Sequence, residues 1–271
     1  MKKFINYSIL IGATITMIAP FLIMVLISFS SKNQLSFTDI AGIVQHLTLK
    51  NYSHVNNTIP VSRYFFNSCL VSILTTVGQI LVSTLAGYAF ARIKFKGRNF
   101  IFFLILITMF IPPQVNIIPL FFLMRELHLV NTFPALILPG VFGGFGIFLM
   151  RQHFLSFPKE LEDASIIDGC NKLQMFFKIA VPLALPAIAT LGIFTFITSW
   201  NSFIWPLIIT NSQNMMTLPL GLAVFKGSYR EIIEWGDLLA CSVICTLPTI
   251  LIFLAGQKLI MNDMLKGGVK E

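Results

Sequence analysis

Residues 159–186 read KELEDASIIDGCNKLQMFFKIAVPLALP, a polar, acid-rich segment between two of the most hydrophobic stretches of the chain. The preceding Pro158 suits the first turn of a helix, where its missing N–H is not needed. Acidic side chains at 160, 162 and 163 then complement the positive end of the helix dipole. The segment therefore predicts a short helix in a water-exposed loop between two apolar stretches.

The same segment also predicts where this helix ends. Gly169 can adopt the left-handed conformation that stops a helix, and Asn171 is a favourable N-cap for a second helix that carries Phe176 and Phe177. Pro182 marks the return to the apolar chain. We expect a short helix set at an angle to the next apolar stretch.

One face of the first helix is predicted to be small and lightly apolar. It is formed by side chains at helical spacing, namely Leu161, Ala164, Ser165 and Asp168. Such a helix can sit in a groove on a partner and be moved as a lever. The plainer alternative is a solvated connector.

Composition places the chain in a membrane. It is 56% hydrophobic and 11% charged, with a mean hydropathy of +0.82, whereas soluble domains carry about 25% charged residues. Uncharged runs, each long enough to cross the hydrocarbon core with about 20 residues, extend over 4–31, 64–91, 99–124, 129–150, 179–225 and 238–257. Asn201, Pro206 and Pro219 interrupt the fifth run, so we count one crossing there.

We therefore predict one all-α integral membrane domain over residues 1–271 with six transmembrane helices. The expected spans are about 7–29, 65–91, 99–122, 131–152, 183–206 and 238–259, and the polar loop covers 156–181. The first apolar run is too long for a signal peptide and has no small-x-small cleavage site, so it is expected to be retained.

Basic residues predict the orientation. With both termini in the cytosol, the cytosolic side holds 13 of the 19 Lys and Arg residues: Lys2, Lys3, Arg92, Lys94, Lys96, Arg98, Arg151, Lys159, Lys172, Lys178, Lys258, Lys266 and Lys270. The short loop 92–98 dominates this positive-inside pattern. The net charge of +8 thus indicates topology rather than nucleic-acid binding, and the loop 156–181 is expected in the cytosol.

The sequence also lacks the motifs of ion-coupled transport, nucleotide binding and hydrolytic catalysis. The membrane-depth parts of the six runs contain no ionisable side chain of the kind that ion-coupled carriers use, which disfavours a secondary carrier. No Gly-x-x-x-x-Gly-Lys-Ser/Thr loop, His-Glu-x-x-His pair or Gly-x-Ser-x-Gly elbow is present. We predict no enzyme activity, catalytic residue, cofactor or metal site in this chain. The four histidines, His46, His54, His128 and His153, are interpreted as ordinary polar surface.

The polar loop resembles the signature of the membrane subunits of ABC importers. Its matching positions are Asp163-Ala164-Ser165, Gly169, Ile179 and Val181-Pro182, with Asp163 in place of the usual Glu and Ser165 in place of the second Ala. Further stretches resemble the carbohydrate branch of these permeases, which includes the shorter membrane subunit of maltose-type importers: 66–68, 86–92, 110–114, 118–120, 148–152, 200–203, 206–207, 235–237 and the tail 265–270.

The resemblance implies a type I ABC importer permease fold with a cytosolic coupling helix. It also implies the partners: a second permease subunit, two ATPase subunits that bind ATP and Mg²⁺, an extracellular solute-binding protein that delivers sugar, and membrane lipid. ATPase coupling is expected from Glu160, Glu162, Asp163, Ala164, Ser165, Asp168 and Gly169. The location implied is a bacterial cytoplasmic membrane.

Other residues are weaker candidates. Pro112, Pro113 and Pro119 are expected to break regular helix in the third span. A substrate path is one interpretation of Pro112, Trp200, Asn201 and Trp205, and a packed helix kink or structural role is the other. Binding-protein contact is proposed for Lys226, Tyr229, Arg230 and Trp235, against a plain surface loop. Glycines at 140, 143, 144 and 146 favour close helix packing, and Cys241 and Cys245 favour packing over a metal site.

We therefore predict that the chain is a permease subunit, which forms half of the translocation path of an ATP-driven, binding-protein-dependent importer for a sugar or oligosaccharide. Three alternatives remain: a permease of the same superfamily for a phosphate ester or amino acid, a secondary carrier, and a membrane scaffold or sensor without flux.

Overall fold

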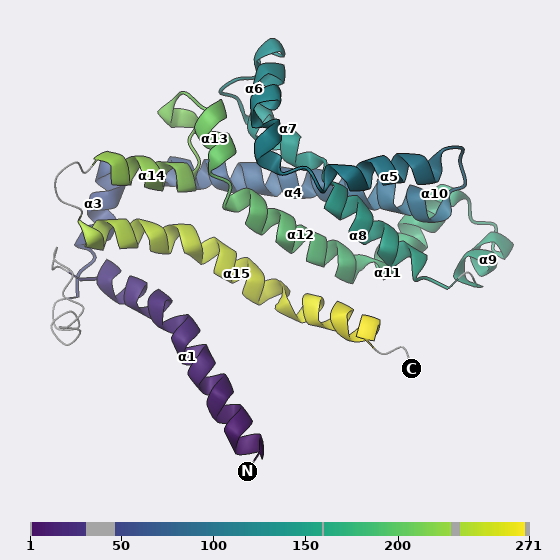
Figure 1. Ribbon diagram of the computed structural model, residues 1–271, viewed down its shortest axis with the longest axis horizontal. Helices are drawn as coiled ribbons and strands as arrows, with labels where there is room; N and C mark the ends of the chain where they lie inside the picture. The colour runs from purple at the N-terminus through teal and green to yellow at the C-terminus, as the bar shows by residue number, and fades with distance from the viewer. Residues whose placement is uncertain (1, 31–46, 159, 229–233, 269–271) are drawn as a thin grey trace. The chain divides into compact units, whose positions relative to one another are not determined.

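The computed structural model describes residues 2–30, 47–158, 160–228 and 234–268 (Figure 1). The described chain is helical, apart from turns and an isolated antiparallel bridge between Ser30 and Leu47. It divides into two compact units. Unit 1 comprises residues 1–65 and 217–249, and unit 2 comprises residues 66–216 and 250–271.

Unit 1 is built around a short polar helix. Its elements are α1 (Lys2–Ser28), α3 (Lys50–Thr58), the start of α4 (Val61–Arg92), α14 (Leu218–Ser228) and the first part of α15 (Trp235–Gly268). The buried Asn51 amide of α3 donates to the carbonyls of Ser28 and Ser30, at 2.9 and 2.8 Å. These bonds satisfy carbonyls at the end of α1 that have no partner within the helix.

Unit 2 contains the other helices of the described chain. They are the rest of α4, α5 (Arg98–Thr108), η1 (Pro113–Asn116), α6 (Ile117–Glu126), α7 (Phe133–Val141), α8 (Gly144–Leu155), α9 (Glu160–Ile167), α10 (Lys172–Met175), η2 (Phe176–Ala180), α11 (Val181–Leu183), α12 (Leu185–Trp200), α13 (Ile204–Ile209), η3 (Gln213–Met215) and the end of α15.

Small residues let α4 approach α7 and α8 closely. A Cβ atom added at Gly140 would lie 2.6 Å from Thr75, and one added at Gly87 would lie 2.6 Å from the Cβ atom of Met150. Both distances are shorter than any tolerated carbon contact, so a larger side chain would push the helices apart. The expected close packing of this glycine-rich stretch is confirmed.

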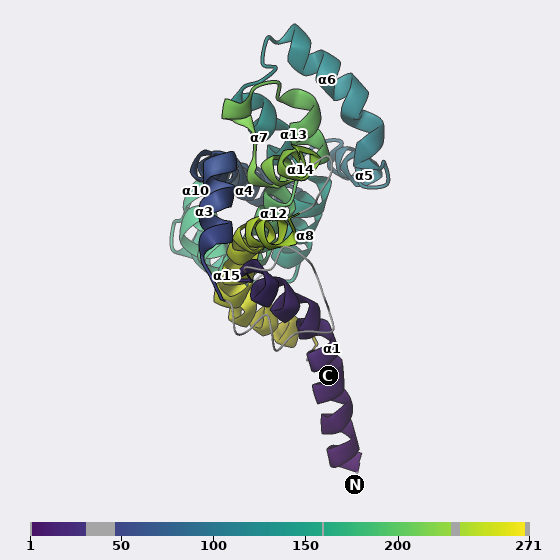
Figure 2. The same cartoon turned by 90° about the vertical axis from the view of Figure 1, so that its left-hand side faces the viewer.

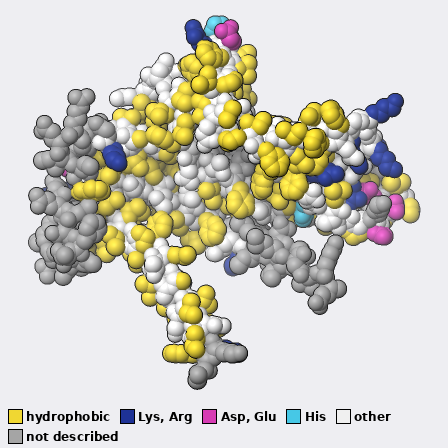
Figure 3. All heavy atoms as spheres, viewed as in Figure 1, with side chains coloured by type: hydrophobic (Ala, Val, Ile, Leu, Met, Phe, Trp, Pro, Cys, Tyr) yellow, Lys and Arg dark blue, Asp and Glu magenta, His cyan; other side chains and the backbone are white. Residues whose placement is uncertain are grey.

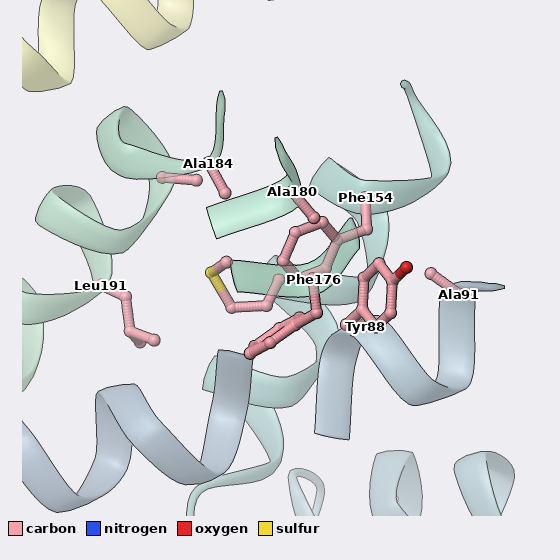
Figure 4. Packing of buried hydrophobic residues seen from close by; sticks show 9 residues of the cluster. Tyr88, Ala91, Phe154, Phe176, Ala180, Ala184 and Leu191 are labelled. Atoms are coloured by element: carbon pink, nitrogen blue, oxygen red, sulfur yellow. The ribbon is translucent and has the colours of Figure 1, made fainter. Parts of the chain in front are cut away.

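A hydrophobic cluster anchors the loop end of unit 2 (Figure 4). It joins α4, α8, η2 and α12 through Tyr88, Ala91, Met150, Phe154, Phe176, Ala180, Ala184, Ala187 and Leu191. The rings of Tyr88 and Phe154 meet edge to face, with centroids 5.4 Å apart. This arrangement fixes the ends of α4 and α8 where the polar loop begins.

Among the described residues, four helices are long and apolar enough to cross a membrane, and two bent helix pairs bring the number to six if each pair is one crossing. The third expected span is one of these pairs: its two arms, Arg98–Thr108 and Pro113–Glu126, meet at 94° (Figures 1 and 2). This confirms the helix break predicted at Pro112 and Pro113, whereas Pro119 lies in the first turn of α6 and does not break that helix. The other pair, Lys172–Leu183 and Leu185–Trp200, is bent by 72°, and its second arm lies within the fifth expected span, 183–206. The count of six spans and the single-domain organisation stay predictions.

Candidate functional site

The polar loop contains the short helix that the sequence predicts. It is α9, which begins after Pro158 with Glu160, Glu162 and Asp163 in its first turn. Gly169 has φ +76°. The Cys170 amide donates to the Ser165 carbonyl at 2.9 Å, and the Gly169 amide donates to the Ile166 carbonyl at 3.0 Å. These two bonds form a Schellman motif, which confirms the predicted helix stop.

A second local device follows at once. Asn171 accepts a hydrogen bond from the Gln174 amide at 2.8 Å, and the Gln174 side chain accepts one from the Asn171 amide at 2.9 Å. This reciprocal capping box starts α10 and confirms Asn171 as an N-cap. The chain then passes through the π-helical η2 to Pro182. Both ends of the turn between α9 and α10 are thus fixed by local hydrogen bonds.

The exposed face of α9 agrees with the expected one in part. Of its four expected members, Leu161, Ala164 and Asp168 are exposed, but Ser165 is buried, and its hydroxyl donates to the Glu162 carbonyl at 2.8 Å. The helix also presents Ile166 and Ile167 to solvent, which are 62% and 85% exposed. Asp163 and Ala164 are exposed beside them. A helix of two turns has too few residues for periodicity to decide which face turns inward.

Glu162 is the second difference, because it pairs within the chain. Its carboxylate lies 3.1 Å from Nη1 of Arg92, at the end of α4. The Arg92 side chain is only 10% exposed, and its Nε and Nη2 also donate to main-chain carbonyls of Phe154 and Phe157. Arg92 belongs to the basic loop that predicts orientation, and that loop offered no signal for this pairing.

Charged side chains gather at this end of unit 2. Acidic groups of α9 and basic groups of the α4–α5 loop are visible together in Figure 3, whereas hydrophobic side chains cover much of the visible surface along the helices. The Arg92–Glu162 contact shows directly that the loop 92–98 and α9 lie at the same end. This agrees with the prediction that both segments face the same side of the membrane.

The candidate substrate-path residues lie in different surroundings. Trp200 is 1% exposed and stacks on Phe196, with ring centroids 5.7 Å apart. Trp205 donates its indole N–H to the Ala135 carbonyl at 2.9 Å. Asn201 is exposed, but its amide donates to the Ile197 carbonyl, and Pro112 is exposed at the 94° bend. These contacts favour the structural interpretation of the two tryptophans.

The candidate binding-protein contacts lie in unit 1. Lys226 is exposed near the end of α14, and Trp235 is 38% exposed at the start of α15. Tyr229 and Arg230 fall outside the described residues. The contact itself stays a prediction.

Unit 1 also holds a charged group that sequence reasoning missed. His54 of α3 is hydrogen-bonded through Nδ1 to the carboxylate of Asp237, which is buried in the first turn of α15. Glu234 lies 3.7 Å from the same nitrogen. One ligand-type atom from each of the three residues lies within 4.8 Å of the others, and mutual pairing of His54 and Asp237 accounts for this clustering. This pairing corrects the interpretation of His54 as ordinary polar surface. Because His54 and Asp237 are 183 positions apart, no local pattern indicates their contact.

The charges of this group shift its pKa values. Hydrogen bonding to Asp237 raises the pKa of His54 above its ordinary 6.5, despite the opposing effect of partial burial. A hydrogen bond with Asp237, aided by burial, raises the pKa of Glu234. At neutral pH the group therefore favours protonated His54 more than an isolated histidine would.

Comparison with known proteins gives consistent matches. The family described as "Binding-protein-dependent transport system inner membrane component" matches residues 79–265. The chain is 40% identical over 254 residues to the arabinooligosaccharides transport system permease protein AraQ of Halalkalibacterium halodurans, covering 93% of this chain and 90% of that protein. It is 34% identical to the lactose transport system permease protein LacG of Rhizobium radiobacter, covering 100% and 97%.

A solved structure matches the fold. It is the crystal structure of a bacterial ABC transporter involved in the import of the acidic polysaccharide alginate. The TM-score is 0.81 at 23% identity, and the match covers 94% of this chain and 95% of the other. The expected ABC importer permease fold is confirmed.

Proposed function

We propose that this chain forms half of the membrane path of a sugar or oligosaccharide importer. The chain belongs to the family of binding-protein-dependent transport system inner membrane components. The names of its relatives support a sugar as the solute, since they include permeases for arabinooligosaccharides and for lactose. The chain is a transporter component rather than an enzyme.

The observation that carries the coupling role is the shape of α9. The helix is held between the Schellman motif at Gly169 and the close contacts of Arg92, and it presents Ile166 and Ile167 to solvent beside Asp163. An exposed apolar pair with an acidic neighbour is suited to a groove on another protein. We assign that groove to an ATPase subunit, which holds the ATP and Mg²⁺ that this chain is not expected to bind.

The proposed complex contains this chain, a second permease subunit, two ATPase subunits and an extracellular solute-binding protein. The bacterial cytoplasmic membrane is the proposed location, with both termini and α9 in the cytosol, as the basic residues predict. Closure of the ATPase pair would shift the groove that holds α9, and α9 would pass that shift to the membrane helices.

Co-purification and uptake test this proposal. An affinity-tagged chain, extracted from its own membranes in mild detergent, should bring down an ATPase and a second permease in stoichiometric amounts. Proteoliposomes made from this complex and its binding protein should accumulate arabinooligosaccharide or lactose only when ATP is enclosed. A chain that purifies alone and moves solute on an ion gradient would be a secondary carrier. ATP-driven uptake of an amino acid or glycerol phosphate, but of no sugar, would refute the sugar assignment.

A further inference from the structure

One guanidinium group connects three elements at the loop end of unit 2. Arg92, at the last position of α4, donates from Nε and Nη2 to the Phe154 carbonyl at 2.9 and 2.6 Å. Nη2 also donates to the Phe157 carbonyl at 2.6 Å, and Nη1 lies 3.1 Å from the Glu162 carboxylate of α9. All these residues belong to unit 2.

The carbonyl partners explain why the group must be an arginine. Phe154 lies in the last turn of α8, where the final carbonyls of a helix have no partner within it and carry its negative dipole end. A planar guanidinium can donate to both carbonyls and to a carboxylate at once, in a fixed fork. A lysine keeps the charge but cannot reproduce this geometry.

The surroundings keep the fork in place. The Arg92 side chain is 10% exposed. Phe154 is fully buried and meets Phe157 edge to face, with ring centroids 5.7 Å apart and an interplanar angle of 90°. A buried charge that loses its partners is strongly destabilising. The bonds of Arg92 should therefore persist when the helices move. The end of α4, the end of α8 and the first turn of α9 should therefore move together.

We propose that Arg92 is a positioning residue for coupling: it sets the angle of α9 against α4 and α8, so that displacement of α9 is transmitted to those helices. This inference rests on the proposed function of α9. In this arrangement Glu162 is the residue of α9 that binds Arg92. Asp163, Ile166 and Ile167 remain exposed and available to the partner.

The test measures coupling separately from assembly. The complex is reconstituted with its binding protein, and sugar uptake per ATP hydrolysed is compared for wild type, Arg92→Lys, Arg92→Gln and Glu162→Leu. Lys96→Gln is the matched control, because Lys96 is an exposed basic residue of the same loop. The amount of ATPase subunit that co-purifies with each variant reports assembly.

We expect Arg92→Gln to assemble and to lose about tenfold in uptake per ATP, within the usual range of coupling between sites. Arg92→Lys should fall between Arg92→Gln and wild type, and Lys96→Gln should match wild type. Glu162→Leu should show a smaller loss, because Arg92 keeps its carbonyl partners. The double variant Arg92→Gln with Glu162→Leu should lose less than the product of the two single effects, since both changes break one link.

The outcomes separate this inference from the proposed function. An Arg92→Gln complex that assembles and keeps the wild-type uptake per ATP would overturn the positioning role. If Arg92→Gln fails to assemble, Glu162→Leu decides, and an unchanged ratio in that variant also overturns it. A wild-type complex without ATP-driven sugar uptake would refute the proposed function instead.

Discussion

The Arg92 group in unit 2 and the His54 group in unit 1 both tie a short helix to a longer one, but through different chemistry. The guanidinium of Arg92 binds two main-chain carbonyls as well as a carboxylate, and arginine as a residue type keeps its charge in proteins. His54 is 52% exposed in its side chain and relies on a carboxylate partner, Asp237, for its charge. The first link is permanent, whereas the second depends on protonation.

The comparison suggests a division of labour. A link that carries force between α9 and α4 gains from a charge that does not titrate and from partners in the backbone, which cannot rotate away. The His54 link lies beside the candidate binding-protein contact Trp235 and is predicted to face the outside of the cell.

The two groups are predicted to face opposite sides of the membrane. The experiment uses a variant in which serine replaces the four native cysteines, Cys69, Cys170, Cys241 and Cys245. Into this variant a single cysteine is introduced at Asn57 or at Lys96, which are both exposed. A membrane-impermeant maleimide added to intact cells should label Asn57→Cys and leave Lys96→Cys unlabelled. Permeabilised cells serve as the control and should label both. Labelling of Lys96→Cys in intact cells would reverse the orientation and place α9 outside.

The Arg92 region also depends on backbone geometry at Gly169. A Cβ atom there would meet nothing within 4 Å, so a substitution acts through the positive φ alone. Gly169→Val should cost about 1–3 kcal/mol locally and re-aim α9, whereas Gly169→Asn, which tolerates positive φ, should cost less. ATPase activity of the reconstituted complex, with and without binding protein and sugar, measures the result. Stimulation and uptake at wild-type levels in Gly169→Val would make this loop a plain connector.

The His54 link should weaken as pH rises, unlike the Arg92 link. Because the folded pKa of His54 is raised above 6.5, its stabilising contribution is present below pH 6.5 and is lost as pH rises through the folded pKa. The pKa of Glu234 is also raised above its ordinary 4.5, so the stabilising contribution of this carboxyl group likewise falls as pH rises above 4.5. The exposure of His54 keeps the effect small, on the order of 2 °C in thermal unfolding of the purified complex.

His54→Gln is the matched variant for this measurement. It should remove the pH-dependent part of the unfolding temperature above pH 6.5, while Arg92→Lys should leave that part unchanged. An identical pH profile in His54→Gln and wild type would show that the His54–Asp237 pair contributes nothing measurable.

Local sequence determined much of this protein. Composition and uncharged runs indicated a membrane protein. Gly169 and Asn171 predicted the helix stop and the cap because each acts through its own backbone and its immediate neighbours. Pro112 and Pro113 predicted the break in the third span for the same reason. Such features need no knowledge of distant residues.

Tertiary structure alone decided which side chains meet. Arg92 contacts Phe154 across 62 positions, and His54 contacts Asp237 across 183. The inward turn of Ser165 and the burial of Trp200 likewise depend on neighbours from other elements. The physical reason is that burial and ion pairing are properties of a packed arrangement, which brings distant positions together, whereas helix stops and caps are settled within a few residues.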